Sequence, residues 1–175
     1  MGAHVKADDR MVDQTELQVQ RIFIVVFLLT AYFLDWWVLV ALQAVILFIT
    51  FLNPGYSPYI ALYRNVLQRT GLIRPDRRLD NSEAHRFAAV IGALVSSCAA
   101  YLLSTGRPSL GWGLVWLMIV LVSVACAGWC AGCFVYYILN RLGLKGFFQY
   151  TAIGGAFPGY RPSKIDWLGS QQGKK

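Results

Sequence analysis

Long apolar blocks separated by short polar segments dominate the chain of 175 residues. Four blocks are long enough to be read as membrane-spanning helices, because a hydrocarbon core of about 30 Å takes roughly 20 helical residues. They lie at about residues 17–34, 36–52, 86–104 and 111–139, and the second is the shortest. The pattern therefore predicts an all-α integral membrane protein with four transmembrane helices, packed as a bundle of two hairpins.

Capping signals mark where the first two blocks begin. Asp13-Gln14-Thr15-Glu16 forms a capping box, in which the Asp13 side chain accepts a hydrogen bond from the Glu16 backbone N–H. Asp35 stands directly before Trp36 and Trp37. An acidic N-cap followed by two tryptophans indicates a tight turn at a membrane–water interface.

A shorter amphipathic segment lies between the second and third blocks. Ser57 and Pro58 are suited to the N-cap and first helical position, and Gly71 stops the helix. Its apolar face consists of Tyr59, Leu62, Tyr63, Val66 and Leu67, and its polar face of Arg64, Asn65, Gln68 and Arg69. The pattern predicts a short amphipathic helix lying in the membrane interface. Packing of the same face on the protein itself is an equal alternative.

Composition and charge support a membrane location. The chain is 57% hydrophobic and 14% charged, with a mean hydropathy of +0.49, whereas about a quarter of the residues of a soluble domain are charged. Its net charge of +7 would raise nucleic-acid binding in a soluble protein. Here the basic residues flank apolar blocks, so we expect a lipid bilayer as the surroundings and no nucleic-acid partner.

The distribution of lysine and arginine predicts the orientation. All of them except Arg107 lie at or before the start of the first block, between the second and third blocks, or after the fourth. Because cytoplasmic loops carry the excess of basic residues, we expect both termini to be cytoplasmic. Residues 1–12 then form a cytoplasmic N-terminal segment, residues 13–139 the membrane domain, and residues 140–175 a cytoplasmic tail rich in glycine, aromatic and basic residues.

Three of the four cysteines fall in the second half of the last block. Cys126, Cys130 and Cys133 are four and three residues apart, which places them along one face of a helix. Counted from the cytoplasmic ends at 1.5 Å per residue, Cys98 of the third block lies at a similar depth of about 18 Å and could meet Cys126 and Cys130. The candidate catalytic pair is Cys130 and Cys133, and the possible accessory residues are Cys98, Cys126, His85 and Arg86.

The chemistry of this pair stays open at the level of the sequence. The C-x-x-C spacing can close a disulfide, but a continuous helix would place the pair near its C-terminal end, where the dipole disfavours a thiolate. A break at Gly128 or Gly132 would remove that objection. Thiolates suit Cu(I) or Zn, but neither His4 nor His85 is in register to complete a site, so no metal or cofactor is predicted. In the alternative, Gly128 and Gly132 form a G-x-x-x-G and the cysteines only pack helices.

Several short motifs, taken in order, resemble one family. They are Asp13-Gln14, Tyr56-Ser57-Pro58, Arg86-Phe87-Ala88 with Gly92, and Cys130-Ala131-Gly132-Cys133. Over about residues 12–139 they resemble the uncharacterised bacterial membrane family called domain of unknown function 4395. The resemblance implies a location in the bacterial plasma (inner) membrane. Because members tend to be encoded near thioredoxin-like or thiosulfate-sulfurtransferase proteins, it also implies thiol or sulfur chemistry with a cytoplasmic partner of that kind. Cys98, Cys126 and the tail lie outside the pattern.

We therefore expect a multi-pass membrane protein of unknown activity whose Cys130–Cys133 pair faces the cytoplasmic half of the membrane. The pair would exchange thiol and disulfide, or carry sulfur in transfer. The alternative is a non-enzymatic structural or transporter component whose cysteines and glycines only pack helices. Whether the chain is an enzyme and whether it forms a homo-oligomer stay open.

Overall fold

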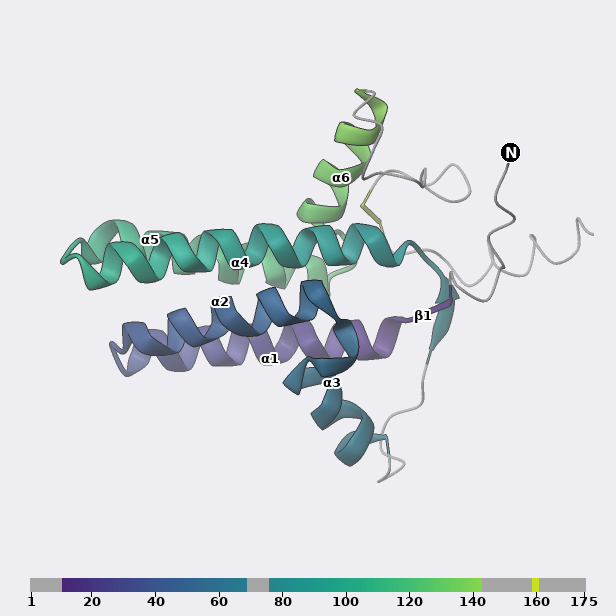
Figure 1. The fold of residues 1–175 in the computed structure, drawn as a ribbon, viewed down its shortest axis with the longest axis horizontal. Coiled ribbons are helices and arrows are strands. Elements are labelled where there is room, and N and C mark those ends of the chain that lie inside the picture. The colour runs from purple at the N-terminus through teal and green to yellow at the C-terminus, as the bar shows by residue number, and fades with distance from the viewer. Residues whose placement is uncertain (1–10, 69–75, 143–158, 161–175) are drawn as a thin grey trace, which may run out of the picture.

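The computed structural model describes residues 11–68, 76–142 and 159–160 (Figure 1). Most of the expected N-terminal segment, with His4, and most of the expected tail lie outside the described residues. The elements are, in chain order, β1 (Met11–Asp13), α1 (Gln14–Phe33), α2 (Trp37–Leu52), η2 (Pro54–Tyr56), α3 (Pro58–Leu62), η3 (Tyr63–Leu67), β2 (Arg77–Leu79), α4 (Ser82–Ser104), α5 (Pro108–Cys126) and α6 (Ala131–Arg141). The predicted helical class is confirmed.

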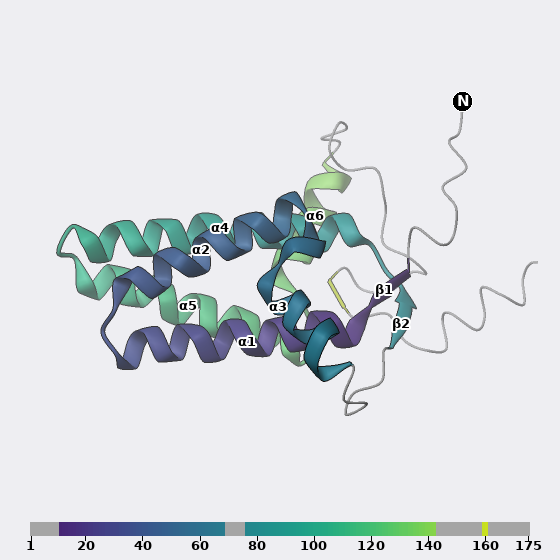
Figure 2. The ribbon, with the colours of Figure 1, turned by 60° about the horizontal axis from the view of Figure 1, so that its bottom comes forward.

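Four long helices, α1, α2, α4 and α5, lie side by side as a bundle (Figures 1 and 2). α2 packs against α1 and α4, and α5 packs against α4 and α1, which closes the ring. The core between them is apolar, and Leu28, Val40 and Val115 at its centre are each at most 1% exposed. The bundle therefore buries one face of each helix and leaves the other faces outward.

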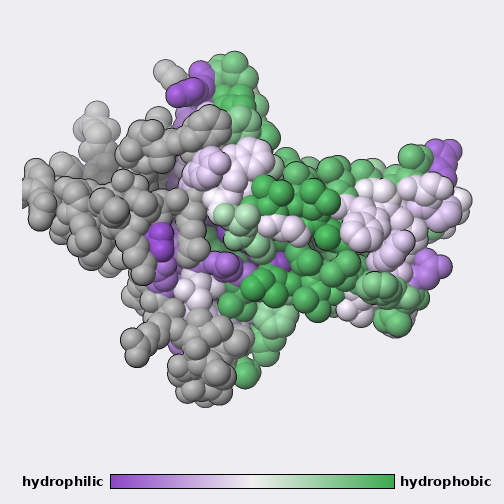
Figure 3. Space-filling model, turned by 180° about the vertical axis from the view of Figure 1, so that it is seen from behind, coloured by the Kyte–Doolittle hydropathy of each residue, from purple (hydrophilic) through white to green (hydrophobic). Residues whose placement is uncertain are grey.

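The outward faces of the bundle are apolar. Val26, Leu94 and Val120 are 54%, 62% and 53% exposed, and hydrophobic residues cover much of the middle of the bundle in Figure 3. Helices α1, α4 and α5 are long and apolar enough to cross a membrane. α2 has 16 residues, or about 24 Å at 1.5 Å per residue, which is shorter than a hydrocarbon core of about 30 Å. Apolar surface of this extent fits contact with lipid.

Helix α4 packs through small residues. Its buried residues are Ala84, Ala89, Gly92, Ala93, Ser96, Ala99 and Ala100. A Cβ atom added at Gly92 would lie 3.1 Å from Cδ1 of Leu47 and 3.3 Å from Cε of Met118. Small residues let helix backbones approach closely in lipid. The close packing that the sequence assigned to the last block is therefore found mainly on α4.

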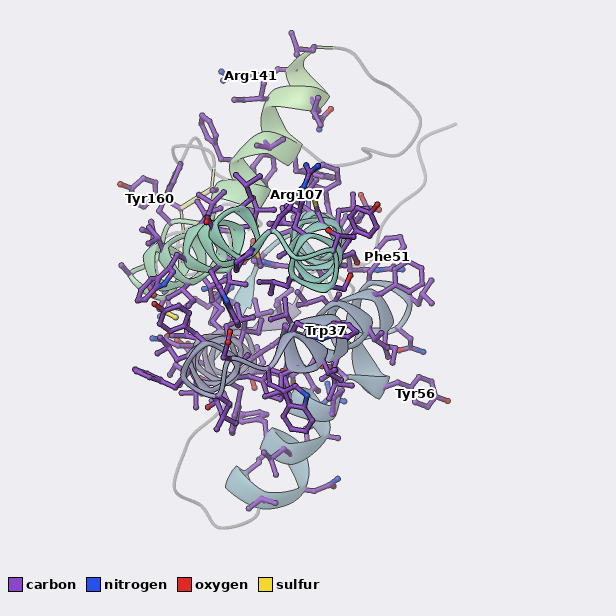
Figure 4. All side chains as sticks on the ribbon, turned by 90° about the vertical axis from the view of Figure 1, so that its left-hand side faces the viewer. Trp37, Phe51, Tyr56, Arg107, Arg141 and Tyr160 are labelled. Carbon is purple, nitrogen blue, oxygen red and sulfur yellow. The ribbon has the colours of Figure 1, made fainter. Side chains whose placement is uncertain are left out.

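The turns that join α1 to α2 and α4 to α5 lie together at one end of the bundle, here called the turn end, which faces the viewer in Figure 4. Asp35 has φ 48° and the N-cap of α2 is Trp36, so the predicted capping role of Asp35 is wrong. Its carboxylate instead accepts a hydrogen bond from Nε1 of Trp112 at 3.1 Å. Tryptophans at this end fit a membrane–water interface.

The opposite end, here called the site end, holds the remaining elements (Figure 2). β1 and β2 form a two-stranded antiparallel sheet with Val12 opposite Arg78. This sheet was not predicted, since strands of three residues carry almost no periodic signal. It brings the start of α1 beside the start of α4, and the backbone N–H of Gln14 donates to the carbonyl of Asp76 at 2.9 Å.

The predicted cap of the first helix is confirmed. The Asp13 carboxylate accepts from the backbone N–H groups of Thr15 and Glu16 at 2.9 and 3.4 Å. The Glu16 side chain forms an ion pair with Arg64 at 3.1 Å and so ties the segment after α2 to α1.

Helix α3 and the π-helical turn η3 pack on the protein through tyrosines. Tyr59 and Tyr63 are 7% and 1% exposed, and the Tyr59 ring stacks on Phe23 with 5.9 Å between centroids. Leu62 and Val66, on the same predicted face, are 41% and 50% exposed. The tyrosines therefore contact the protein, and an interfacial position of this segment stays a prediction.

Candidate functional site

The predicted fourth span, residues 111–139, is not one helix, and that prediction is wrong. α5 ends at Cys126 and α6 begins at Ala131, with Gly128 between them at φ 111°. This backbone conformation favours glycine, which has no Cβ atom. α6 then leaves the side of the bundle (Figure 1). Gly128 and Gly132 consequently do not share a helix face, and Gly128 serves to end α5 rather than to pack it.

The break places Cys130 at the N-cap of α6. Its Sγ accepts a hydrogen bond from the backbone N–H of Cys133, with 3.3 Å between sulfur and nitrogen. The N-terminal end of a helix carries a partial positive charge, which favours a thiolate. In a continuous helix the dipole would disfavour a Cys130 thiolate. In the observed structure it favours one, because Cys130 lies at the N-terminal end of α6.

Cys133 lies in the first turn of α6 and is 3% exposed. Its Sγ is 3.5 Å from Nδ1 of His85, and Nε2 of His85 is 2.8 Å from Oδ2 of Asp80. The Gln14 amide donates to the same carboxylate oxygen at 2.6 Å. The expectation that His85 is out of register with the thiols is wrong, since the break turns Cys133 towards α4. A thiol, an imidazole and a carboxylate in series form an arrangement in which the imidazole can take the thiol proton.

Opposite pKa shifts distinguish the two thiols. The pKa of Cys130 is lowered, chiefly by a hydrogen bond from the Cys133 thiol and further by the charge of a protonated His85, while burial opposes both. The pKa of Cys133 is raised by the same hydrogen bond and by burial. Burial alone would raise the pKa of Asp80, but contacts led by the His85 hydrogen bond hold it below its ordinary value. Of the two thiols, Cys130 therefore loses its proton more readily, and Cys133 keeps its proton to higher pH.

Two contacts hold α6 against the start of α4. A Cβ atom added at Gly132 would lie 2.6 Å from the Cβ of Ala88, so a larger residue cannot be accommodated without movement. The hydroxyl of Tyr136, a residue 1% exposed, donates to Glu83 at 2.9 Å. Cys133 packs beside Tyr136 in a small apolar cluster. The close approach expected at Gly132 is thus confirmed, with α4 as the neighbouring helix.

Residues 159–160 lie against the break between α5 and α6. The backbone N–H of Cys130 donates to the carbonyl of Gly159 at 2.9 Å, and Trp129 forms an antiparallel bridge with Tyr160. Gly159 has φ 90°, and a Cβ atom there would lie 2.9 Å from the Cys130 carbonyl oxygen. A segment distant in sequence therefore stabilises the backbone that presents Cys130.

Of the four possible accessory residues, only His85 lies beside the Cys130–Cys133 pair. Cys98 has an exposed side chain on α4, and Cys126 is the last residue of α5. Neither is part of the cluster around Cys133, so the expected meeting of Cys98 with Cys126 and Cys130 is not found. Arg86 donates to the carbonyls of Phe51 and Leu52 at 2.9 and 3.4 Å. It therefore caps the end of α2.

Sequence reasoning missed Asp80 and Arg21 as members of the site. Asp80 stands in a polar loop, where nothing local separates it from other acidic residues. Arg21 lies near the start of the first apolar block, where an arginine commonly extends its guanidinium to the headgroups, so its position gave little sign of a site. Its Nη1 donates to the carbonyl of Ala125 at 2.8 Å, and its charge also lowers the pKa of Cys130.

The donor set of the site favours thiol chemistry. Within residues 11–68, 76–142 and 159–160, no group of three His, Cys, Asp or Glu side chains has the geometry to hold a metal ion. What the site offers is a partly exposed cysteine at a helix N-terminus, a buried second cysteine, and a histidine that bridges the second cysteine to a carboxylate. This combination can form and reduce a disulfide.

Fold and site together define the class: a helical protein with three helices able to cross a membrane and a C-x-x-C pair at the start of a further helix. The sequence matches the family described as "Domain of unknown function (DUF4395)" over residues 12–141, and the chain belongs to this family, as the resemblance implied. Cys130, Cys133, His85 and Asp80 lie within the match, whereas residues 159–160 lie beyond it. No curated protein and no solved structure matches the chain.

Proposed function

We propose that this membrane protein exchanges disulfides with a protein partner through Cys130 and Cys133. The observation that carries the proposal is the N-cap position of Cys130, with Cys133 buried behind it and 3.5 Å from His85. A partly exposed nucleophile and a buried resolving thiol are what a reversible dithiol site needs. A structural role for the cysteines alone would not require His85 and Asp80 in series behind Cys133, and ionisable groups of this kind gather at functional sites.

The exchange proceeds in two balanced steps. The Cys130 thiolate attacks one sulfur of a partner disulfide, forms a mixed disulfide, and expels the other partner sulfur as a thiolate. Cys133 then passes its proton to Nδ1 of His85 and attacks the Cys130 sulfur, which releases the second partner thiolate. The Asp80 carboxylate stabilises the resulting imidazolium. Two electrons have moved to the partner, and the reverse sequence oxidises a partner dithiol.

The same proposal includes a placement in the membrane. Helices α1, α2, α4 and α5 cross the bacterial inner membrane, with the short α2 accommodated by tilt or local thinning. Arg64, Arg78 and Arg86 lie in the elements of the site end and Arg107 in the turn end, which supports a cytoplasmic site end and cytoplasmic termini. The partner is then a cytoplasmic thioredoxin-like or sulfurtransferase protein.

Trapping of the mixed disulfide tests this function. Cys133→Ser removes the resolving thiol, so the variant should accumulate covalent complexes with a cytoplasmic thiol protein on non-reducing gels. Cys130→Ser should accumulate none, and Cys98→Ser, at an exposed site on α4, should behave like the parent protein.

Mass spectrometry of alkylated protein separates the remaining hypotheses. A sulfur-carrier role predicts an additional sulfur atom on Cys130 after exposure to thiosulfate. A purely packing role predicts free thiols under a mild oxidant and under thiosulfate alike, and that result would refute both uses of the pair.

A further inference from the structure

A mostly apolar groove of about 140 Å³ runs between α1, α4 and α5 and ends at the Cys130 site. Ile24, Met118 and Val122 line it within the bundle, and Ile91, 37% exposed, places one side of it at the outer surface. An outward apolar surface on these helices faces lipid in the proposed placement. The groove therefore links the membrane interior with the reactive sulfur.

The size of the groove restricts its occupant. Pockets for drug-sized ligands measure about 300–1,000 Å³, so a groove of about 140 Å³ admits a single ring and excludes a nucleotide or flavin. A long apolar substituent on that ring could remain in the lipid outside.

Polar groups at the inner end of the groove restrict the chemistry of that ring. Gln20, Arg21, His85 and Cys130 are the polar members of the lining. The Arg21 guanidinium is fixed there by its hydrogen bond to the Ala125 carbonyl at 2.8 Å. A plain acyl chain has no use for a half-buried cation. A ring with carbonyl oxygens does, because those oxygens become negative as the ring is reduced.

A second cavity reaches His85 from the polar side. It measures about 450 Å³ and is lined by charged groups that include Asp13, Glu16 and Arg64. His85 lines both cavities. The imidazole thus borders both an apolar space suited to a lipid-soluble molecule and a space with charged groups through which protons can be exchanged.

We propose that the groove binds the head group of a lipid-soluble quinone, which takes two electrons from the Cys130–Cys133 dithiol. This inference rests on the proposed disulfide exchange and supplies its terminal oxidant. The Cys130 thiolate adds to the quinone ring. Cys133 gives its proton to His85 and attacks the Cys130 sulfur, so that the sulfur–carbon bond breaks and its electron pair stays on the ring.

The products are the Cys130–Cys133 disulfide and a hydroquinone. One of the two hydroquinone protons comes from Cys133 through His85, and the other comes from solvent. The disulfide then oxidises a dithiol of the protein partner, which returns the pair to its reduced form. Electrons therefore flow from a cytoplasmic dithiol to the membrane quinone pool.

Quinone reduction by the full-length protein in phospholipid nanodiscs tests the inference. Dithiothreitol serves as electron donor, decylubiquinone as the probe, and oxidised glutathione as a soluble disulfide for comparison. The parent protein should accelerate the reduction of both above the protein-free rate, and Cys130→Ser should accelerate neither. Reduction of glutathione disulfide without reduction of decylubiquinone overturns the quinone site and leaves the disulfide exchange standing. Failure with both substrates overturns the proposed function itself.

Two tryptophan substitutions on α5 locate the quinone. Val122 lines the groove, whereas Val120 is 53% exposed and does not line it. Val122→Trp should lower the rate of quinone reduction relative to glutathione reduction by on the order of 100-fold, since a displaced ring loses its reactive geometry. Val120→Trp should leave the ratio unchanged. Equal ratios in the two variants overturn the assignment of the groove.

Arg21→Met examines the charge in the groove. Removal of a group that stabilises developing negative charge costs about 10²–10³ in rate, so quinone reduction should fall by that order. A rate equal to that of the parent overturns the role given to the guanidinium and, with it, the argument for a quinone over a plain lipid chain.

Discussion

The two ends of the bundle are built on the same apolar helices but bury different groups. At the turn end, Asp35 and Trp112 share an exposed hydrogen bond. At the site end, Gln14, Asp80 and His85 form a chain of hydrogen bonds, with the side chains of Asp80 and His85 only 14% and 16% exposed. Burial of polar groups costs free energy unless they are well paired. The site end therefore holds a set of polar side chains that depend on one another for pairing, which the turn end lacks.

This contrast indicates that helices of this kind can be joined at one end of the bundle without such a chain of polar side chains. Two hairpin turns are sufficient to close the bundle at the turn end (Figure 4). Perturbed ionisable groups concentrate at functional sites, and here they concentrate around Cys130 and Cys133. Matched substitutions at the two ends can therefore separate packing from chemistry.

The largest difference is expected between the two carboxylates. Asp80→Asn removes the charge that stabilises the His85 imidazolium when Cys133 loses its proton. Because general acid–base catalysis contributes about 10²–10⁴-fold, the second step of exchange should slow by on the order of 100-fold. Asp35→Asn, at the other end of the bundle, should leave the rate unchanged. Stopped-flow measurement of the release of the second thiol from a chromogenic disulfide checks this, and equal rates in the two variants would contradict the role of Asp80.

Next in size is the difference between two glycines in helices. A Cβ atom at Gly132 would meet Ala88 at 2.6 Å, whereas one at Gly113 has nothing within 4 Å. Gly132→Leu should therefore destabilise the protein by about 1–3 kcal/mol through overpacking, and Gly113→Leu should have little effect. Thermal unfolding in detergent measures both. If Gly132→Leu kept the stability of the parent protein, α6 would not be packed closely on α4.

The apolar pattern predicted the bundle because helix length and hydrophobicity are local properties. The third block was expected at residues 86–104, and α4 covers Ser82–Ser104. The prediction of a continuous fourth helix was wrong because one sequence feature is compatible with two structures. Glycine among small residues can bring two helices together or can end one. Gly128 ends α5, in a break stabilised by the backbone contact of Cys130 with Gly159, and no local pattern could indicate that contact.

Only the part of the candidate site that depends on local sequence could be predicted. The spacing of Cys130 and Cys133 identifies the pair, and His85 was included among the possible accessory residues. Asp80 could not be assigned to it, because its position depends on the β1–β2 pairing that sets Gln14 beside it. The reactivity of Cys130 could not be assigned either, since it depends on which end of a helix the residue occupies.

A smaller difference is expected between two glycines with positive φ. Gly128 has φ 111° and Gly106, in the turn between α4 and α5, has φ 76°. Substitution by alanine should cost each about 1–2 kcal/mol, because an L-residue is strained in that region. Only Gly128→Ala should also slow alkylation of Cys130 by iodoacetamide, since it disturbs the backbone that places this sulfur at the helix N-terminus. If Gly128→Ala kept the alkylation rate of the parent protein, the reactivity of Cys130 would not depend on the break between α5 and α6.

The smallest expected difference is the pH dependence of a thiol at each end. The pKa of Cys130 lies below its ordinary value, chiefly because of the hydrogen bond from Cys133. A cysteine introduced by Thr105→Cys would stand at the C-cap of α4, where the helix dipole opposes a thiolate. Only the thiolate reacts with iodoacetamide, so the rate at each site falls as the pH drops through its own pKa. The profile of Cys130 should therefore fall at the lower pH.

The size of this effect follows from two opposing trends in the thiolate. Lowering a thiol pKa by one gives about tenfold more thiolate below that pKa but makes the thiolate about threefold less nucleophilic, so the net gain is only about threefold. Peptide-resolved mass spectrometry after timed alkylation between pH 5 and 9 can measure both profiles in one protein. His85→Gln removes the coulombic contribution of His85 that favours the Cys130 thiolate and should move the Cys130 profile to higher pH. If the Cys130 and Thr105→Cys profiles coincide, neither the hydrogen bond from Cys133 nor the helix N-terminus activates Cys130, and the two ends of the bundle are chemically equivalent for a thiol.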